Sequence, residues 1–126
     1  MLPMLLDITE SNNYYAENNI AITLKYSNNN NLKKNICSVG DFYSFDDTLI
    51  KLEYSDNNII TENILNSNAD FGFYLDNSDS NRIEKHEIKE CVNGMKLIYT
   101  EQNTIKCNNI SYNDEFGIDL IESRMD

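Results

Sequence analysis

The chain has 126 residues, which is the size of one domain and too short for two separate cores. Its formal net charge is −11, but apolar residues make up 40% of it and recur along its whole length, which excludes a disordered acidic tail. No segment approaches the ~20 apolar residues of a membrane span. Cys37, Cys91 and Cys107 are widely spaced and odd in number, which indicates reduced core thiols and neither a disulfide framework nor a zinc cluster. We predict one soluble, cytoplasmic domain over residues 1–126.

The first predicted strand covers residues 20–26, where four apolar side chains alternate with smaller or polar ones and so share one face of an extended segment. The same alternation predicts strands at residues 50–54, 59–64 and 69–75. Residues 55–58 are polar and turn-forming, so they predict a hairpin between the second and third of these strands.

The second half of the chain contains the strongest turn signal. Asn93 and Gly94 can supply the two positive φ angles of a type I′ turn, which predicts a hairpin between residues 91–92 and 95–99. Short apolar alternations between residues 105 and 120 predict further strands near the C-terminus.

Residues 11–19 and 84–92 are the candidates for short helices. We find no internal repeat of fixed period, and we interpret the 21 asparagines as the composition of an AT-rich genome. Short strands at intervals of about ten residues are typical of small all-β domains. The predicted fold is therefore mainly β, as an antiparallel meander, sandwich or small barrel, with an α+β domain containing one or two short helices as the alternative.

The titratable residues do not indicate catalysis. Many enzymes that work at neutral pH use a histidine base, and the one histidine here, His86, stands between charged neighbours as surface histidines do. The sequence contains no nucleophile elbow, phosphate-binding loop, zinc-protease motif or dinucleotide fingerprint. We predict that the protein is not an enzyme and needs no cofactor.

Residues 76–87 have the spacing of a metal-binding loop. Oxygen-bearing side chains stand at positions one, three, five, nine and twelve, and calcium takes about six to eight oxygen ligands. These candidate ligands are Asp76, Ser78, Ser80, Glu84 and Glu87. The segment resembles the calcium loop of the EF-hand family, although Asn81 stands where that family has glycine. A plain polar loop is the other interpretation.

The acidic charge is unevenly distributed. Residues 48–80 carry a net charge of −5 and residues 110–126 one of −4, whereas residues 81–109 carry +1. This excess of carboxylates disfavours direct binding to nucleic acid and favours a basic protein partner, whose approach it would accelerate. The candidate partner-binding residues are acids and one tyrosine: Tyr112, Asp114, Glu115, Asp119, Glu122, Asp70 and Asp56.

These observations lead to the hypothesis of a non-catalytic, immunity-type inhibitor, in which an acidic surface neutralises a basic toxin or nuclease in the cytoplasm. A calcium-binding module built on residues 76–87 is one alternative. A viral or assembly protein that mimics the charge of nucleic acid is another, and acidity that serves only solubility is a third. None of these functions requires contact with a membrane.

Overall fold

A computed structural model describes residues 7–8, 13–16, 20–39 and 47–124, and this part of the chain forms 15 strands and no helix. The strands belong to three sheets of five strands each, and every pair of neighbouring strands in them is parallel. The predicted antiparallel meander, sandwich or barrel is therefore wrong. Of the predicted helix at residues 11–19, residues 13–16 form a strand and the rest lies outside the described residues. The predicted helix at residues 84–92 is wrong. Residues 84–92 instead hold the end of one strand, a corner and a second strand.

Each sheet contains one strand from each turn of the chain. Sheet A contains β1 (Asp7–Ile8), β4 (Asn31–Lys33), β7 (Ile59–Thr61), β10 (Arg82–Glu84) and β13 (Thr104–Lys106). Sheet B contains β2 (Asn13–Ala16), β5 (Ile36–Val39), β8 (Ile64–Asn66), β11 (Glu87–Lys89) and β14 (Asn109–Ser111). Sheet C contains β3 (Ile20–Lys25), β6 (Thr48–Glu53), β9 (Phe71–Asp76), β12 (Asn93–Ile98) and β15 (Phe116–Ile121).

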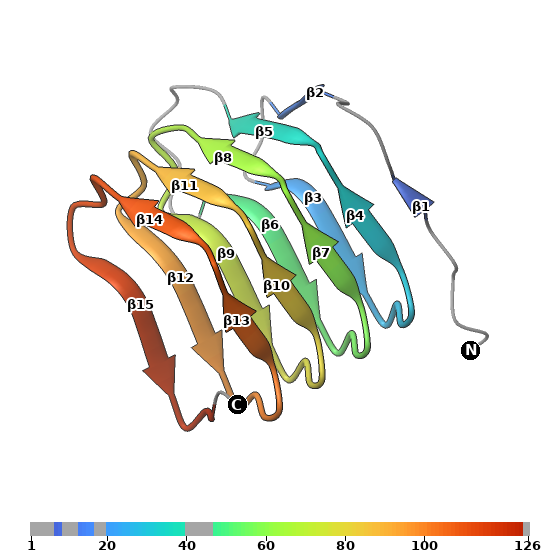
Figure 1. The fold of residues 1–126 in the computed structure, drawn as a ribbon. Coiled ribbons are helices and arrows are strands. Elements are labelled where there is room, and N and C mark those ends of the chain that lie inside the picture. The colour runs from blue at the N-terminus through green and yellow to red at the C-terminus, as the bar shows by residue number, and fades with distance from the viewer. Residues whose placement is uncertain (1–6, 9–12, 17–19, 40–46, 125–126) are drawn as a thin grey trace.

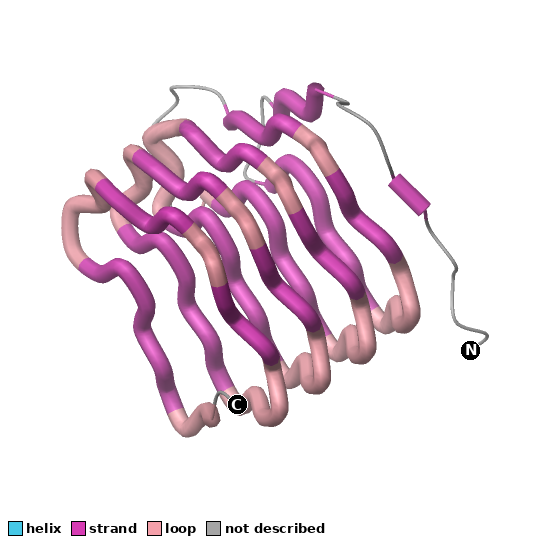
Figure 2. The backbone as a smooth tube through the Cα atoms, in the orientation of Figure 1, coloured by secondary structure: helices cyan, strands magenta, loops and turns pink. Residues whose placement is uncertain are grey.

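The chain winds as a β-solenoid, because it passes from sheet C to sheet A to sheet B and then begins the next coil in sheet C (Figure 1). Equivalent residues of successive coils lie 28, 23 and then 22 positions apart, as in the series Asn30, Asn58, Asn81 and Asn103. The corners of the coils stack in the same way as the strands (Figure 2). The chain thus has a structural repeat, contrary to our prediction, and each coil packs mainly on its neighbours.

The core consists of columns of apolar side chains that stack from coil to coil. Sheet C contributes one column of leucines, each at most 1% exposed: Leu24, Leu52, Leu75 and Leu97. Because the outer face of each sheet is accessible to solvent, the strands alternate between apolar and polar residues, as half-exposed antiparallel strands do. The sequence pattern therefore located the strands of sheet C to within a few residues, but it joined β7 and the start of β8 into one strand and suggested the wrong pairing.

Neither predicted hairpin forms. Residues 55–58 form a corner between β6 and β7, which lie in different sheets. Asn93 and Gly94 begin β12, and no glycine in the described part of the chain has a positive φ. Gly94 has a packing role instead, because a Cβ atom there would lie 2.5 Å from Ile110 Cγ2 and 2.6 Å from the Gly117 carbonyl oxygen.

Non-glycine residues with positive φ form the corners. Tyr26, Tyr54 and Tyr99 follow strands of sheet C with φ values of 49°, 49° and 52°. Their backbone N–H groups each donate to a carbonyl oxygen of the next coil at 3.0 Å, which holds the left-handed conformation in place. The first predicted strand consequently ends at Lys25, and the Tyr26 ring is exposed and stacks on that of Tyr54 at 5.1 Å.

Two ladders of mostly buried side chains run along the solenoid, one at the far end of the corner that begins with these tyrosines and the other at the corner between sheets A and B. The first consists of Asn30, Asn58, Asn81 and Asn103, and the second of Asn35, Asn63, His86 and Asn108. In both, a side-chain acceptor receives the backbone N–H of the preceding coil, at 2.8–3.0 Å. The fold thus uses these asparagines directly, which the compositional interpretation missed.

Candidate functional site

His86 is the only titratable member of the two ladders. It is 2% exposed, and its Nδ1 accepts the Asn63 backbone N–H at 3.0 Å while its Nε2 lies 2.9 Å from the Ile60 carbonyl oxygen. This arrangement suits the neutral ring with its proton on Nε2. Burial lowers the pKa of His86 to about 4. The predicted surface histidine is therefore a structural residue of the interior.

This buried histidine predicts a loss of stability in acid. Unfolded His86 titrates near pH 6.5 and folded His86 near pH 4, so between these values the unfolded chain binds a proton that the folded chain does not. We expect the group to remove about 2 kcal/mol from the free energy of unfolding between about pH 7 and about pH 4.5. Urea unfolding of the wild type and of His86→Asn at both pH values measures this. The carboxylates titrate in both proteins, so the difference between the two isolates the contribution of His86. Equal pH dependence of the two proteins would contradict it.

The five candidate calcium ligands lie along three sides of one coil. Asp76 ends β9 in sheet C, and Ser78 is buried at the next corner, where its hydroxyl donates to the Asp76 carbonyl oxygen at 2.9 Å. Ser80 lies further around that corner, Glu84 ends β10 in sheet A, and Glu87 begins β11 in sheet B. No cluster of three His, Cys, Asp or Glu side chains that could hold a metal ion occurs among the residues that the structure describes. The structure therefore does not support the calcium-module alternative.

The candidate partner-binding residues do not form one patch. Five belong to the last described coil but lie on different sides of it: Tyr112, Asp114, Glu115, Asp119 and Glu122. Tyr112 is the most exposed of them, at 83%, and Asp119 lies 3.9 Å from Lys96. Asp56 and Asp70 belong to an earlier coil, where each accepts a backbone N–H through its side chain.

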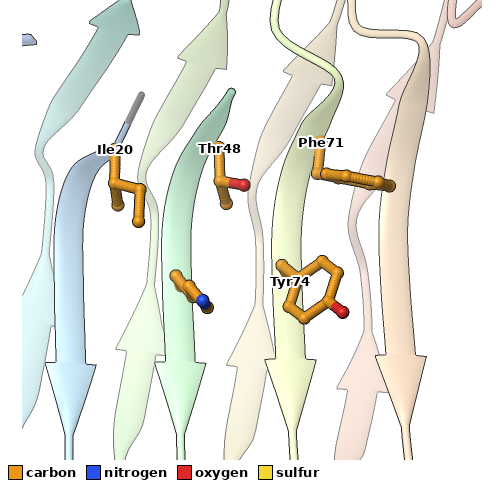
Figure 3. Close-up of a pocket in the computed structure, with 5 residues that line it drawn as sticks. Ile20, Thr48, Phe71 and Tyr74 are labelled. Carbon is orange, nitrogen blue, oxygen red and sulfur yellow. The ribbon is translucent and has the colours of Figure 1, made fainter. Parts of the chain in front are cut away.

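The outer face of sheet C contains a shallow cavity of about 150 Å³ that crosses β3, β6 and β9. Five side chains from these strands line it: Ile20, Thr48, Lys51, Phe71 and Tyr74. Figure 3 shows them side by side along the three neighbouring strands. We refer to this cavity as the sheet C groove.

Aromatic rings and ammonium groups are packed together in and beside the sheet C groove. The rings of Phe71 and Tyr74 meet edge to face, with centroids 5.2 Å apart. The Lys51 ammonium lies 5.6 Å from the centre of the Tyr74 ring, and the Lys96 ammonium 5.4 Å from that of Phe71. Such cation–π contacts hold rings and cations in place, so the groove has a defined shape.

The carboxylate beside the groove is held toward its ionised form by two lysines. Glu53 lies 2.9 Å from the Lys25 ammonium and 3.6 Å from that of Lys51. The hydrogen bond from Lys25 is the main cause that lowers the pKa of Glu53. Glu53 can therefore accept hydrogen bonds from a ligand, but it is poorly suited to donate a proton as a general acid.

Sequence reasoning missed the groove because its residues appeared to belong to the core. Ile20 and Phe71 stand at positions where simple alternation turns them inward with Ile22 and Phe73. At the start of β9, however, Gly72 and Phe73 both face the interior, since a Cβ on Gly72 would meet Ile88 Cγ2. This break in alternation turns Phe71 outward. The signal available in the sequence was Gly72, the glycine directly before the buried Phe73, because it marks the break in alternation.

The soft donor atoms that copper prefers are not gathered at one site in the described part of the chain. Cys37 and Cys91 are buried, and burial raises the pKa of each thiol to about 12. Cys107 is exposed at a corner, although we predicted a core thiol, and Met95 is part of the core. Both ring nitrogens of His86 are already hydrogen-bonded. A copper site needs several such donors together, and the described residues offer none.

The residues described here contain no helix with the length and apolarity of a membrane span.

The family described as "Periplasmic copper-binding protein (NosD)" matches residues 6–126 of the chain. Neither curated proteins nor solved structures gave a significant match. Because that family is described as periplasmic, the predictions of a cytoplasmic protein and of an immunity-type toxin inhibitor are wrong. The family description names copper, but the described residues of this chain do not bring together the donors that a copper site needs.

Proposed function

Because the chain belongs to the NosD family of periplasmic copper-binding proteins, we propose that it works outside the cytoplasm as a binding solenoid, and that the sheet C groove holds a sugar residue of a neutral polysaccharide. The observation that carries this proposal is the combination, in one outer depression, of an aromatic pair with a hydroxyl and an ammonium group.

The chemistry of the groove matches the two sides of a sugar ring. A pyranose has an apolar face of C–H groups, which packs on a flat aromatic surface such as that of Tyr74. Its hydroxyls need donors and acceptors around that surface. Thr48 and Lys51 line the groove, and Glu53 lies 3.6 Å from the Lys51 ammonium. Neighbouring strands lie about 4.8 Å apart, which is the scale of one sugar residue, so the outer face of sheet C suits a chain of such residues.

We propose binding without catalysis. Glycoside hydrolysis needs two carboxyl groups, one of them held protonated by a raised pKa. Glu53, the carboxylate in contact with a lysine of the groove, has a lowered pKa instead. A basic protein partner for the acids of the last coil stays a prediction, separate from this site.

The groove predicts a loss of binding on removal of one ring. Tyr74→Ala should weaken binding of the neutral oligosaccharide that the wild type prefers by about tenfold, the value of one aromatic contact. Calorimetric titration with a panel of neutral gluco-, xylo- and chito-oligosaccharides measures this. Tyr99→Ala is the control, because Tyr99 is 52% exposed at a corner and does not line the groove. If no neutral oligosaccharide binds, or if both variants weaken binding equally, the proposal is wrong.

A further inference from the structure

The outer side of sheet A concentrates positive charge in an otherwise acidic chain. Half of the ten basic residues lie on its strands or at the corner that follows them: Lys33, Lys34, Arg82, Lys85 and Lys106. On β4, β7, β10 and β13 and the corners that follow them, the acids are Glu62 and Glu84. We refer to these five cations and their two carboxylates as the sheet A basic face.

One of the two carboxylates is buried between the cations. Glu84 is only 3% exposed in its side chain, and its Oε1 lies 2.8 Å from Arg82 Nε and 3.3 Å from Lys106 Nζ. Arg82 and Lys106 are 56% and 59% exposed. Glu62 lies 3.3 Å from Lys33 Nζ and is 35% exposed, close to the 40% of that lysine. Both carboxylates are counter-ions that hold cations in place, but only Glu84 lies beneath them, and the cationic groups stay accessible.

A groove of about 270 Å³ runs between these side chains across β4, β7 and β10. Lys33, Arg82 and Lys85 border it, and Asn31 and Thr61 add hydrogen-bonding groups. Lys85 forms no ion pair within the described part of the chain, so its charge is the one least neutralised. Glu62 and Glu84 also line the groove, so an oxyanion in it would meet three cations and two carboxylates, of which Glu84 is almost fully buried.

The cations are also spread along the solenoid axis. Lys33 lies on β4 and Lys106 on β13, three strand spacings away, or about 14 Å. That distance exceeds a single small anion and suits a chain with repeated negative groups. At physiological ionic strength charges are screened beyond about 8 Å, so the acids on other sides of the molecule oppose such contact only weakly.

We propose that the sheet A basic face binds an anionic polysaccharide, laid across β4, β7, β10 and β13, whose carboxylate or sulfate groups contact Lys33, Arg82, Lys85 and Lys106. A polysaccharide fits better than single-stranded nucleic acid, because the outward residues of these four strands include no aromatic ring on which bases would stack. This is a second site, on a different sheet from the sheet C groove.

The test uses polygalacturonate as the carboxylated probe, dextran sulfate as the sulfated probe and neutral dextran as the reference, all at about 0.15 M salt. We expect at least one anionic probe to bind and neutral dextran not to bind; which anionic probe binds identifies the oxyanion. Lys33→Gln combined with Lys85→Asn should weaken that binding by about tenfold, since one exposed ion pair is equivalent to about threefold in affinity. Asparagine is chosen at position 85 because φ there is 58°.

Lys89→Gln is the matched control, because Lys89 lies on β11 in sheet B and pairs with Glu87. Unchanged thermal unfolding of the variants shows that the fold is intact. The proposal is overturned if neither anionic probe binds, if the control weakens binding as much as the double variant, or if a single-stranded oligonucleotide binds as tightly as the polysaccharide. Tyr74→Ala should retain this binding in full, so the two binding proposals can fail separately.

Discussion

Asn58→Ala is expected to lower the free energy of unfolding by about 3–5 kcal/mol, the sum of two or three buried hydrogen-bonding groups that lose a partner. Asn58 is 1% exposed. Its Oδ1 accepts the backbone N–H of Asn30 at 2.8 Å and the side-chain amide of Asn30 at 2.9 Å, and its own amide donates to Asn81 Oδ1 at 3.0 Å. Alanine removes all three bonds, and water cannot reach the site to replace them.

Urea unfolding at neutral pH measures this effect. Asn66→Ala is the control, because Asn66 is exposed at the end of β8 and belongs to neither ladder. We expect that control to change the free energy of unfolding by less than about 0.5 kcal/mol. If Asn58→Ala costs no more than Asn66→Ala, the ladders do not stabilise the coils.

Gly72→Ala is expected to cost about 3 kcal/mol, although it adds only one methyl group. A Cβ at position 72 would lie 2.5 Å from Ile88 Cγ2 and 2.6 Å from the carbonyl oxygen of Gly94. The second contact is with backbone, which cannot move without displacing the next coil. Repulsion at such distances forces the coils apart, so both packing and the parallel hydrogen bonds between β9 and β12 are weakened.

Gly117→Ala provides a control of the same chemistry. Gly117 occupies the equivalent position of β15, but a Cβ there would have its nearest neighbour at 3.9 Å, Ile110 Cγ2. Its midpoint of thermal unfolding should stay close to that of the wild type, whereas that of Gly72→Ala should fall by several degrees. Equal behaviour of the two variants would show that the close approach at Gly72 is not limiting.

The sequence could reveal the strands but not how they pair. Residues 20–26 and 50–54 alternate because one side of β3 and β6 faces the core, and that local pattern is the same in parallel and antiparallel sheets. Pairing depends on contacts between residues 22 to 28 positions apart, which periodicity over a few residues does not detect.

A longer signal was present in the sequence. Asparagine followed five residues later by asparagine occurs at Asn30, Asn58 and Asn103, and at Asn81 with His86 in the second place. Each pair spans the short strand of sheet A between two buried corners. The recurrence of these four pairs marks the coils. A count of asparagines alone does not separate them from the other asparagines of the chain.

The site was harder to predict than the fold. The acids were the visible feature of the sequence, but Asp56, Asp70 and Glu122 lie on different coils or corners and do not converge. The basic face was hidden, because Lys33 and Lys106 are 73 positions apart in a chain of net charge −11. Stacking of coils brings them to the same sheet, which a running sum of charge along the sequence cannot show.

The coils differ in length at one corner only. In each of four coils, the first residue of the sheet C strand precedes the asparagine of the first ladder by ten residues, as Thr48 precedes Asn58. The residue of the second ladder follows five residues later. All variation therefore falls between sheet B and the next strand of sheet C, which begins with the groove residues Thr48 and Phe71. A gene for such a chain can gain or lose codons at that corner without shifting either ladder. Variation in length at this corner would thus change the rim of the sheet C groove and leave the rest of the solenoid unchanged. Related chains with corners of different length would then prefer different ligands.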